Sequence, residues 1–213
     1  MTEVMPLKSD PLNVRMFNIL KKMIIYNEFE PGARLVIKDL CNLFRVSSSP
    51  VRDALHFLES DGLVKNDGNC YHVLQLNETD VTEIYSMRKV LEPYALDYAL
   101  PNMDKRELRL LMGRMEAHGN ALSAFEDDMA FHSMIIEACD NSYLKKELYF
   151  LANQSYHIGF KFHTLTNNRI ESNVEHIKVI KAVIDNQSAE ASDSLREHLD
   201  NSMHRILKNC FGK

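Results

Sequence analysis

Asp128 and His132 stand four residues apart in the stretch EDDMAFHSMI, inside a run whose apolar spacing predicts an amphipathic helix. Residues four apart share one face of a helix and lie about one turn from each other. A carboxylate and an imidazole so placed can form a solvated pair, a hydrogen bond in the core, or half of a metal site. This stretch alone leaves all three interpretations open.

The composition is that of a globular protein with one or two domains: 213 residues, 45% of them hydrophobic and 26% charged. The net charge of -5 argues against a general binder of nucleic acids or membranes. Up to Leu76, nine Lys and Arg residues balance nine Asp and Glu residues, whereas sixteen face twenty-one beyond it. The neutral N-terminal part can therefore still bind DNA where its cations cluster, with a non-specific affinity that depends strongly on salt.

Cys41, Cys70, Cys139 and Cys210 are far apart in the sequence and form no C-x-x-C pair, which is typical of reduced thiols in a cytosolic protein. The N-terminus lacks the apolar segment of a signal peptide, and no run approaches the roughly 20 apolar residues that a membrane span needs. We therefore expect a soluble, cytoplasmic protein.

The N-terminal part is predicted to hold three short helices followed by a β-hairpin, the order of a winged helix-turn-helix. Apolar periodicity predicts helices over 13–26 and 35–44, and a third helix that begins near Pro50 and ends at Gly62. The turn of the hairpin is predicted at 66–69, where the sequence reads NDGN. The residues expected to point inward from the second and third helices are Leu40, Leu43, Phe44, Val51, Ala54, Leu55 and Leu58.

The face of the third helix opposite its apolar stripe carries Ser49, Arg52, Asp53 and His56. Such a face can enter the major groove of DNA, where arginine reads guanine and small polar groups hold phosphates. Taken alone, these residues favour the interpretation as an ordinary solvated helix face.

Beyond Val81 the sequence shows further helical patterns, over 81–99, 104–117, 123–138, 142–162, 173–186 and 189–209. The predicted fold is therefore mainly α: a winged helix-turn-helix of three helices plus a β-hairpin in residues 1–76, followed by an all-α bundle of about six helices in residues 77–213.

Two sets of motifs resemble a known family. The stretch EPGARL…LCNLFRVSSSPVRDALHFLESDGLV resembles the DNA-binding motif of the GntR family of bacterial transcription regulators. YSMRKVLEPYALDYA, DMAFH…ACDNSYL and EHIKVIKAVIDNQSAEASDSLREHL resemble the all-helical FCD-type domain of its FadR-like branch. Together these motifs cover nearly the whole chain. The resemblance implies a regulator that binds operator DNA. We expect this regulator to be a repressor.

On this resemblance, the expected DNA-binding residues are Arg45, Ser47, Ser48, Ser49, Arg52 and His56. The chain departs from the family pattern at several of these positions. The arginine usual after the V-S pair is Ser48, and the glycine usual before Val46 is Arg45, which returns a cation to the same neighbourhood. The wing's usual G-R-G is 68–70, Gly-Asn-Cys, so the preferred operator of the relatives does not carry over.

Two further histidines can lie close to the pair Asp128 and His132. His176 falls on one helical stripe with Val179, Ile180 and Val183, and His198 on another with Ala191 and Leu195. Because both stripes face the bundle interior, four ligands from three helices can converge. Imidazoles and a carboxylate suit a divalent ion, with Zn or Ni expected first and Mn, Co or Fe next.

The resemblance assigns a divalent metal to these same four positions. For each histidine taken singly, a hydrogen-bonded core residue remains the alternative. His72 does not match the metal pattern and is interpreted as an ordinary polar residue.

The resemblance also implies a small organic acid as effector, bound beside the metal. We expect Arg88 to bind the carboxylate of this acid, because a guanidinium pairs with two oxygens at once. A surface ion pair with Glu92, four residues on, is the alternative.

Three functions compete at this stage: a regulator that responds to a metabolite, a regulator for which the ion itself is the signal, and a metal enzyme. The enzyme is disfavoured because no motif supplies a general base or a nucleophile. A homodimer is expected, since two reading helices related by a two-fold axis match a palindromic operator.

Overall fold

The structure, a computed structural model, describes residues 10–117, 119–165 and 169–212. The chain divides into two compact units between Leu74 and Gln75. Unit 1 holds the helix-turn-helix region and unit 2 holds the helical bundle, and each is described by itself.

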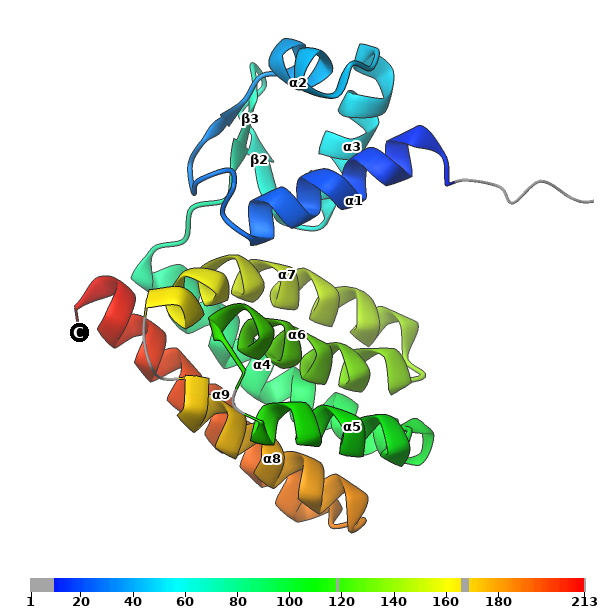
Figure 1. The fold of residues 1–213 in the computed structure, drawn as a ribbon, viewed down its shortest axis with the longest axis vertical. Coiled ribbons are helices and arrows are strands. Elements are labelled where there is room, and N and C mark those ends of the chain that lie inside the picture. Colours follow the sequence, from blue (N-terminus) through cyan, green and yellow to red (C-terminus); the bar gives the residue numbers. More distant parts are fainter. Residues whose placement is uncertain (1–9, 118, 166–168, 213) are drawn as a thin grey trace, which may run out of the picture. The chain divides into compact units, whose positions relative to one another are not determined.

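Unit 1 consists of three helices and a small antiparallel sheet (Figure 1). Its elements are α1 (Leu12–Ile25), β1 (Arg34–Leu35), α2 (Ile37–Phe44), α3 (Ser48–Ser60), β2 (Val64–Asn66) and β3 (Tyr71–Val73). The predicted winged helix-turn-helix is confirmed, with one addition. The two-residue strand β1 pairs with β3, so the hairpin becomes a three-stranded sheet in the order β1-β3-β2.

The core of unit 1 forms where the apolar stripe of α3 meets its neighbours. Val51, Ala54, Leu55 and Leu58 are all fully buried, as their spacing predicts. On α2 the prediction is partly wrong, because Leu40 is buried but Leu43 is 60% exposed. With only eight residues, α2 turns little of its surface inward.

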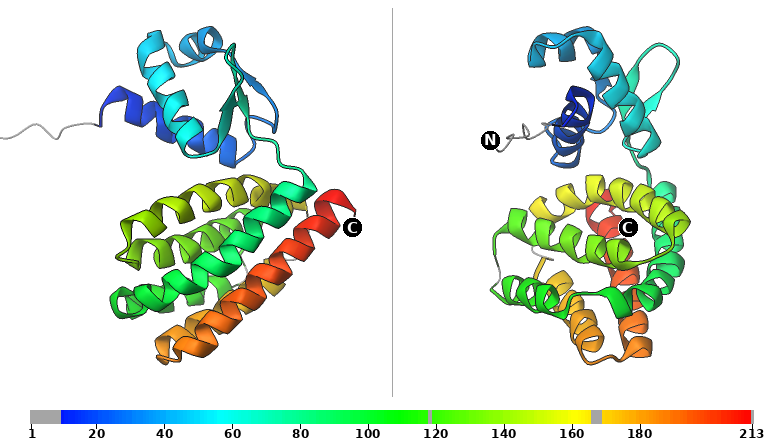
Figure 2. Two further views of the ribbon diagram at one scale, coloured as in Figure 1. Left: turned by 180° about the vertical axis from the view of Figure 1, so that it is seen from behind. Right: turned by 90° about the vertical axis from the view of Figure 1, so that its right-hand side faces the viewer.

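Unit 2 is the predicted helical bundle. Its helices are α4 (Glu78–Ala99), the 3-10 turn η1 (Leu100–Asn102), α5 (Lys105–Glu116), α6 (Ala121–Ala138), α7 (Ser142–Leu165), α8 (Arg169–Ile184) and α9 (Ser188–Phe211). Polar caps fix where several helices begin: Asn77 forms a capping box at α4, and the side chains of Asp104 and Asn120 cap α5 and α6. The long helices α4 and α9 lie side by side (Figure 2), joined by Lys89 and Asp200 at 2.5 Å.

None of the helices in the described ranges combines the length and the apolar character that crossing a membrane requires.

Candidate metal centre and nucleic-acid interface

The bundle brings the four predicted ligand residues together. Asp128 and His132 extend from α6, His176 from α8 and His198 from α9, and one ligand atom of each lies within 4.8 Å of all the others. The three histidines are 0–1% exposed, and the Asp128 side chain is 18% exposed. A solvated pair of Asp128 and His132 is therefore excluded.

The donor spacing fits one ion. The Nε2 atoms of His176 and His198 are 3.0 Å apart, and His176 Nε2 lies 3.5 Å from Asp128 Oδ1. With metal–ligand bonds of about 2.05 Å, two donors on one ion lie about 2.9 Å apart at a right angle and about 4.1 Å apart on opposite sides. No separation in the cluster is more than 4.8 Å, so any excess over that range is less than an ångström, a distance that side-chain rotation covers.

Two carboxylates, the buried Glu92 and the half-buried Glu175, orient two of the histidines from the side away from the cluster. Glu92 on α4 lies 2.7 Å from His132 Nδ1, and Glu175 on α8 lies 2.9 Å from His198 Nδ1. Metal-binding histidines usually donate their second ring N–H in this way, which fixes the tautomer and raises the basicity of the ligand nitrogen. Both rings therefore offer Nε2 to the cluster.

The two carboxylates are themselves held by arginines. Burial alone would raise the pKa of Glu92, but the Arg88 guanidinium and then His132 lower it to about 2. Glu175 is bound by Arg205 through two bonds of 2.7 and 2.6 Å, and Arg205 and His198 lower its pKa to about 2 against the effect of burial.

Burial lowers the pKa of His198, which favours the neutral imidazole that a metal needs.

Arg88 is buried, at 3% exposure, and its Nε donates to Glu92 Oε1 at 2.5 Å. The pair is therefore a buried one, and its interpretation as a surface ion pair is wrong. The Nη2 atom of Arg88 is buried too and makes no hydrogen bond within the described residues. Arg88 and Asp128 both line a small cavity of about 20 Å³. An unsatisfied guanidinium donor thus lies beside the ligand cluster.

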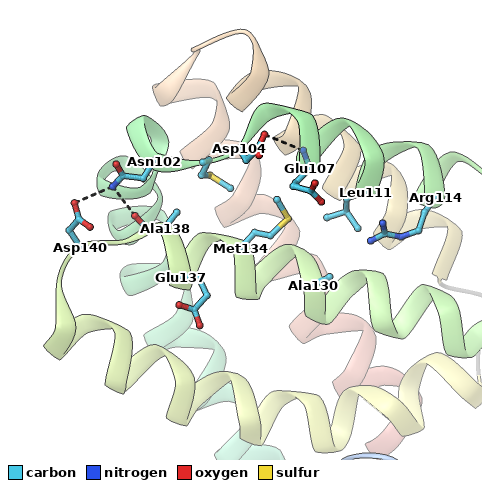
Figure 3. A pocket seen from close by; sticks show the side chains of 11 residues that line it. Asn102, Asp104, Glu107, Leu111, Arg114, Ala130, Met134, Glu137, Ala138 and Asp140 are labelled. Atoms are coloured by element: carbon cyan, nitrogen blue, oxygen red, sulfur yellow. Dashed lines mark hydrogen bonds between the residues drawn. The ribbon is translucent and has the colours of Figure 1, made fainter. Parts of the chain in front are cut away.

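A larger cavity, of about 560 Å³, lies elsewhere, between α5 and α6 (Figure 3). None of the four ligand residues lines it. Its charged lining residues are Asp104, Glu107, Arg114, Glu137 and Asp140. Four carboxylates against one arginine disfavour an acidic ligand, and Arg114 is already paired with Asp127 at 2.7 Å. The cavity therefore does not fit an organic acid.

In unit 1 the predicted DNA-binding residues lie on one exposed surface. Ser47 occupies the N-cap position of α3 without a capping hydrogen bond from its side chain, and Ser48 and Ser49 form the first turn; all three are exposed. Arg52 and His56 follow on the face opposite the buried stripe, and both are exposed. The start of a helix favours phosphate oxygens, because its free N–H groups and its dipole point toward them.

A groove of about 370 Å³ runs between α2, α3 and the hairpin. The basic side chains that line it are Arg34, Lys38, Arg52 and His56. His56 Nδ1 lies 3.1 Å from the Tyr71 hydroxyl, and this contact connects the exposed face of α3 to β3. The DNA-binding residues predicted from the sequence do not include Arg34, which lies within the stretch EPGARL, or Lys38, which follows it by three residues. Three cations of this neutral unit, Arg34, Lys38 and Arg52, thus line one groove.

Arg45 occupies the position of the usual family glycine and adopts a left-handed backbone conformation, with φ of 54° and ψ of 47°. Glycine takes that conformation without strain, whereas a side chain makes it costly. The exposed Arg45 therefore lies at the turn between α2 and α3, at an energetic cost to the fold.

Glu175 and Arg205 were not foreseen as parts of the site. The available signals were weak: Glu175 directly precedes His176, and Arg205 lies two helical turns after His198. Neither spacing shows that α8 and α9 pack with these residues in register.

Comparison with known proteins gives consistent results. Residues 12–68 match the "Bacterial regulatory proteins, gntR family" domain, and residues 83–201 match the FCD domain. The HTH-type transcriptional regulator YdhC of Bacillus subtilis (strain 168) is 34% identical over 149 residues, which are 66% of this chain and 66% of that protein.

A gluconate operon transcriptional repressor from the same organism is 26% identical, over 91% of this chain and 84% of its own. The transcriptional repressor GlaR of Escherichia coli (strain K12) is 25% identical, over 84% of this chain and 89% of its own.

Two solved structures share the fold. Escherichia coli McbR/YncC has a TM-score of 0.79 at 19% identity, covering 95% of this chain and 100% of its own. A transcriptional regulator from Rhodococcus sp. RHA1 has a TM-score of 0.75 at 22% identity, covering 92% of this chain and 98% of its own.

Proposed function

This chain belongs to the GntR family of bacterial regulators with an FCD domain, and from that premise we propose that it is a repressor controlled by a small organic acid. As a member of this family it is a DNA-binding transcriptional regulator and not an enzyme. We propose further that Asp128, His132, His176 and His198 hold a divalent metal and that the acid binds beside it. Arg88 is the residue we assign to the carboxylate of that acid.

The observation that carries this proposal is the pairing of the ligand cluster with an unsatisfied cation. Three buried imidazoles and one carboxylate suit Zn or Ni first, and then Mn, Co or Fe. The buried Nη2 of Arg88 offers a donor on the wall of the cavity that Asp128 also lines. A bound dication would add positive charge there and so strengthen the attraction for a carboxylate.

The effector class rests on the names of relatives. Two relatives are named gluconate operon repressors, which makes gluconate the first acid to test. The cavity of about 20 Å³ is too small for such an acid. The acid must therefore select a wider arrangement of the helices around Arg88. A ligand that prefers one arrangement shifts the protein toward it, and this is the coupling a repressor needs.

The first test measures metal content and thermal stability together. Protein purified without chelator is expected to carry one divalent metal in this cluster, which His176→Ala removes and which the control His204→Ala, an exposed histidine on α9, retains. Gluconate, lactate, succinate and citrate are then compared in thermal melts, with glucose as the neutral control for gluconate. At a hundredfold excess over Kd, a ligand stabilises the folded state by about 2.7 kcal/mol, which corresponds to a melting shift of several degrees.

A metal content of His176→Ala equal to that of the wild type would overturn the ligand set. Melts that respond to no acid would overturn the effector assignment.

A second candidate function has the ion itself as the signal. The small cavity favours it, because a space of about 20 Å³ has room for little more than one water molecule. This function predicts that a chelator alone releases the DNA. Control by an organic acid predicts instead that the metal stays bound while the acid acts. The metal content of the protein released from DNA therefore separates the two functions.

We also propose a cytoplasmic homodimer, since operator DNA lies in the cytoplasm and paired reading helices match a palindromic site. Light scattering of the full chain, alone and on duplex DNA, measures the number of subunits. A single copy on the DNA would contradict the dimer.

A further inference from the structure

The wing hairpin of unit 1 carries a second group of possible metal ligands, separate from the bundle. Asp67 and Cys70 flank the turn between β2 and β3, and His72 follows on β3. One ligand atom of each lies within 4.8 Å of the other two. Cys70 and His72 are two residues apart on an extended chain, so both side chains leave the same face.

The turn holds Asp67 in a fixed orientation. Its Oδ1 accepts hydrogen bonds from the backbone N–H groups of Asn69 and Cys70, both at 2.9 Å. These bonds, that from Cys70 first, hold the pKa of Asp67 below its ordinary value, so the carboxylate is ionised. Gly68 makes the tight turn with φ of +90°. One carboxylate oxygen therefore serves the turn, and the other, Oδ2, is left for the side chains of Cys70 and His72.

The three donor atoms form a nearly regular triangle. Cys70 Sγ lies 3.8 Å from Asp67 Oδ2 and 3.8 Å from His72 Nδ1, and His72 Nδ1 lies 3.7 Å from Asp67 Oδ2. Three such ligands on a tetrahedral zinc ion, with bonds of about 2.0 to 2.3 Å, lie about 3.3 to 3.6 Å apart. The triangle needs to contract by only a few tenths of an ångström.

We propose that Asp67, Cys70 and His72 bind a zinc-class divalent ion at the tip of the wing. A thiolate, an imidazole and a carboxylate are the donor types that zinc prefers. The fourth position is left to solvent, since Asp67 is exposed and the other two are half-exposed. Binding replaces the thiol proton with a dication, so the local charge rises by one unit, from the -1 of Asp67 to zero. Binding of this ion requires neither the metal centre of the bundle nor an effector.

Cobalt(II) added to the full-length protein tests the site specifically. A cobalt–thiolate bond gives a charge-transfer absorption in the near ultraviolet, which aspartate and histidine ligands do not give. The cluster in the bundle contains no cysteine and is therefore silent in this band. We expect the band in the wild type, its loss in Cys70→Ser, and its retention in the matched control Cys41→Ser, a half-exposed cysteine in the same unit.

A third variant separates binding from the shape of the turn. Asp67→Asn keeps an amide oxygen for the backbone N–H groups of Asn69 and Cys70 but places an amide nitrogen, which does not bind zinc, at the other position. We expect cobalt to bind at this site, as followed by the thiolate band, at least tenfold more weakly, with an unchanged circular dichroism spectrum. Absence of the band from the wild type, its persistence in Cys70→Ser, or full affinity in Asp67→Asn would overturn the proposal.

Discussion

Arg45 combines an exposed cation, which we propose contacts DNA, with a backbone conformation that lowers the stability of the fold. Its left-handed backbone at the C-terminal cap of α2 suits glycine, and its side chain is exposed. Arg45→Gly is therefore expected to raise the free energy of unfolding of unit 1 by about 1 kcal/mol. The same change removes a cation and should weaken DNA binding. Amide hydrogen exchange in α1, α2 and α3 under urea measures the first effect, and a binding titration on duplex DNA measures the second.

Arg45→Lys is the matched control, since it keeps both the backbone strain and the charge and should change neither quantity. If glycine lowered the stability of unit 1, the strain assigned to this position would be wrong.

Glu175 lies outside the proposed ligand set but contacts one of its members. Its carboxylate binds His198 Nδ1 on one side and Arg205 on the other. Glu175→Gln keeps the shape but loses the charge that orients the ring, so the bundle should bind zinc about 10 to 100 times more weakly. Competition with a coloured chelator measures the affinity. Glu171→Gln is the control, because Glu171 is 67% exposed and 3.9 Å from the same arginine. An equal loss in both variants would point to Arg205 and not to the orientation of His198.

At the scale of elements, α3 is the part whose assignment matters most for DNA recognition. Arg52 is exposed on its polar face and lines the basic groove. Arg52→Ala should cost about 1 to 3 kcal/mol of specific operator binding, the range for one bidentate arginine–guanine contact. The operator is first selected from random duplexes, and affinities are then measured at one fixed salt concentration.

Arg15→Ala tests whether any exposed arginine would behave alike, since Arg15 is exposed on α1 and does not line that groove. Its effect should stay small. Unchanged affinity in Arg52→Ala would remove α3 as the reading helix.

Among the helices and strands, some could be predicted from the sequence and others could not. Long apolar stripes such as those of α6 and α9 were visible because every turn repeats the signal. The strand β1 was not, because two residues carry no periodicity and its pairing with β3 joins distant parts of the chain. Leu43 was wrongly predicted to point inward, because the apolar pattern of a helix of eight residues does not show which side meets its neighbours.

For the site, the sequence predicted which residues could meet but not what surrounds them. His176 and His198 stand on apolar stripes, and this predicted their burial. The links from His132 to Glu92 and from His198 to Glu175 depend on how far α4 and α8 are shifted along their partners. That shift is set by packing over whole helices, so no local pattern records it.

At the scale of the whole molecule, the proposed repressor must couple unit 2 to unit 1, and coupling between two binding sites is reciprocal. If the acid that stabilises the protein most weakens DNA binding by a certain factor, saturating duplex DNA must weaken binding of that acid by the same factor. We expect a factor of about 5 to 150, the usual range for allosteric coupling. Both directions are measured by titration at one salt concentration, because the DNA affinity itself changes with salt. The variant Arg88→Lys keeps the buried charge beside Glu92 but loses the paired donors, and should reduce the factor in both directions alike.

Unequal factors in the wild type would mean that the acid also acts outside the bundle, for instance on the DNA-binding surface itself. Equal factors of one would show that this acid, although bound, is not the signal.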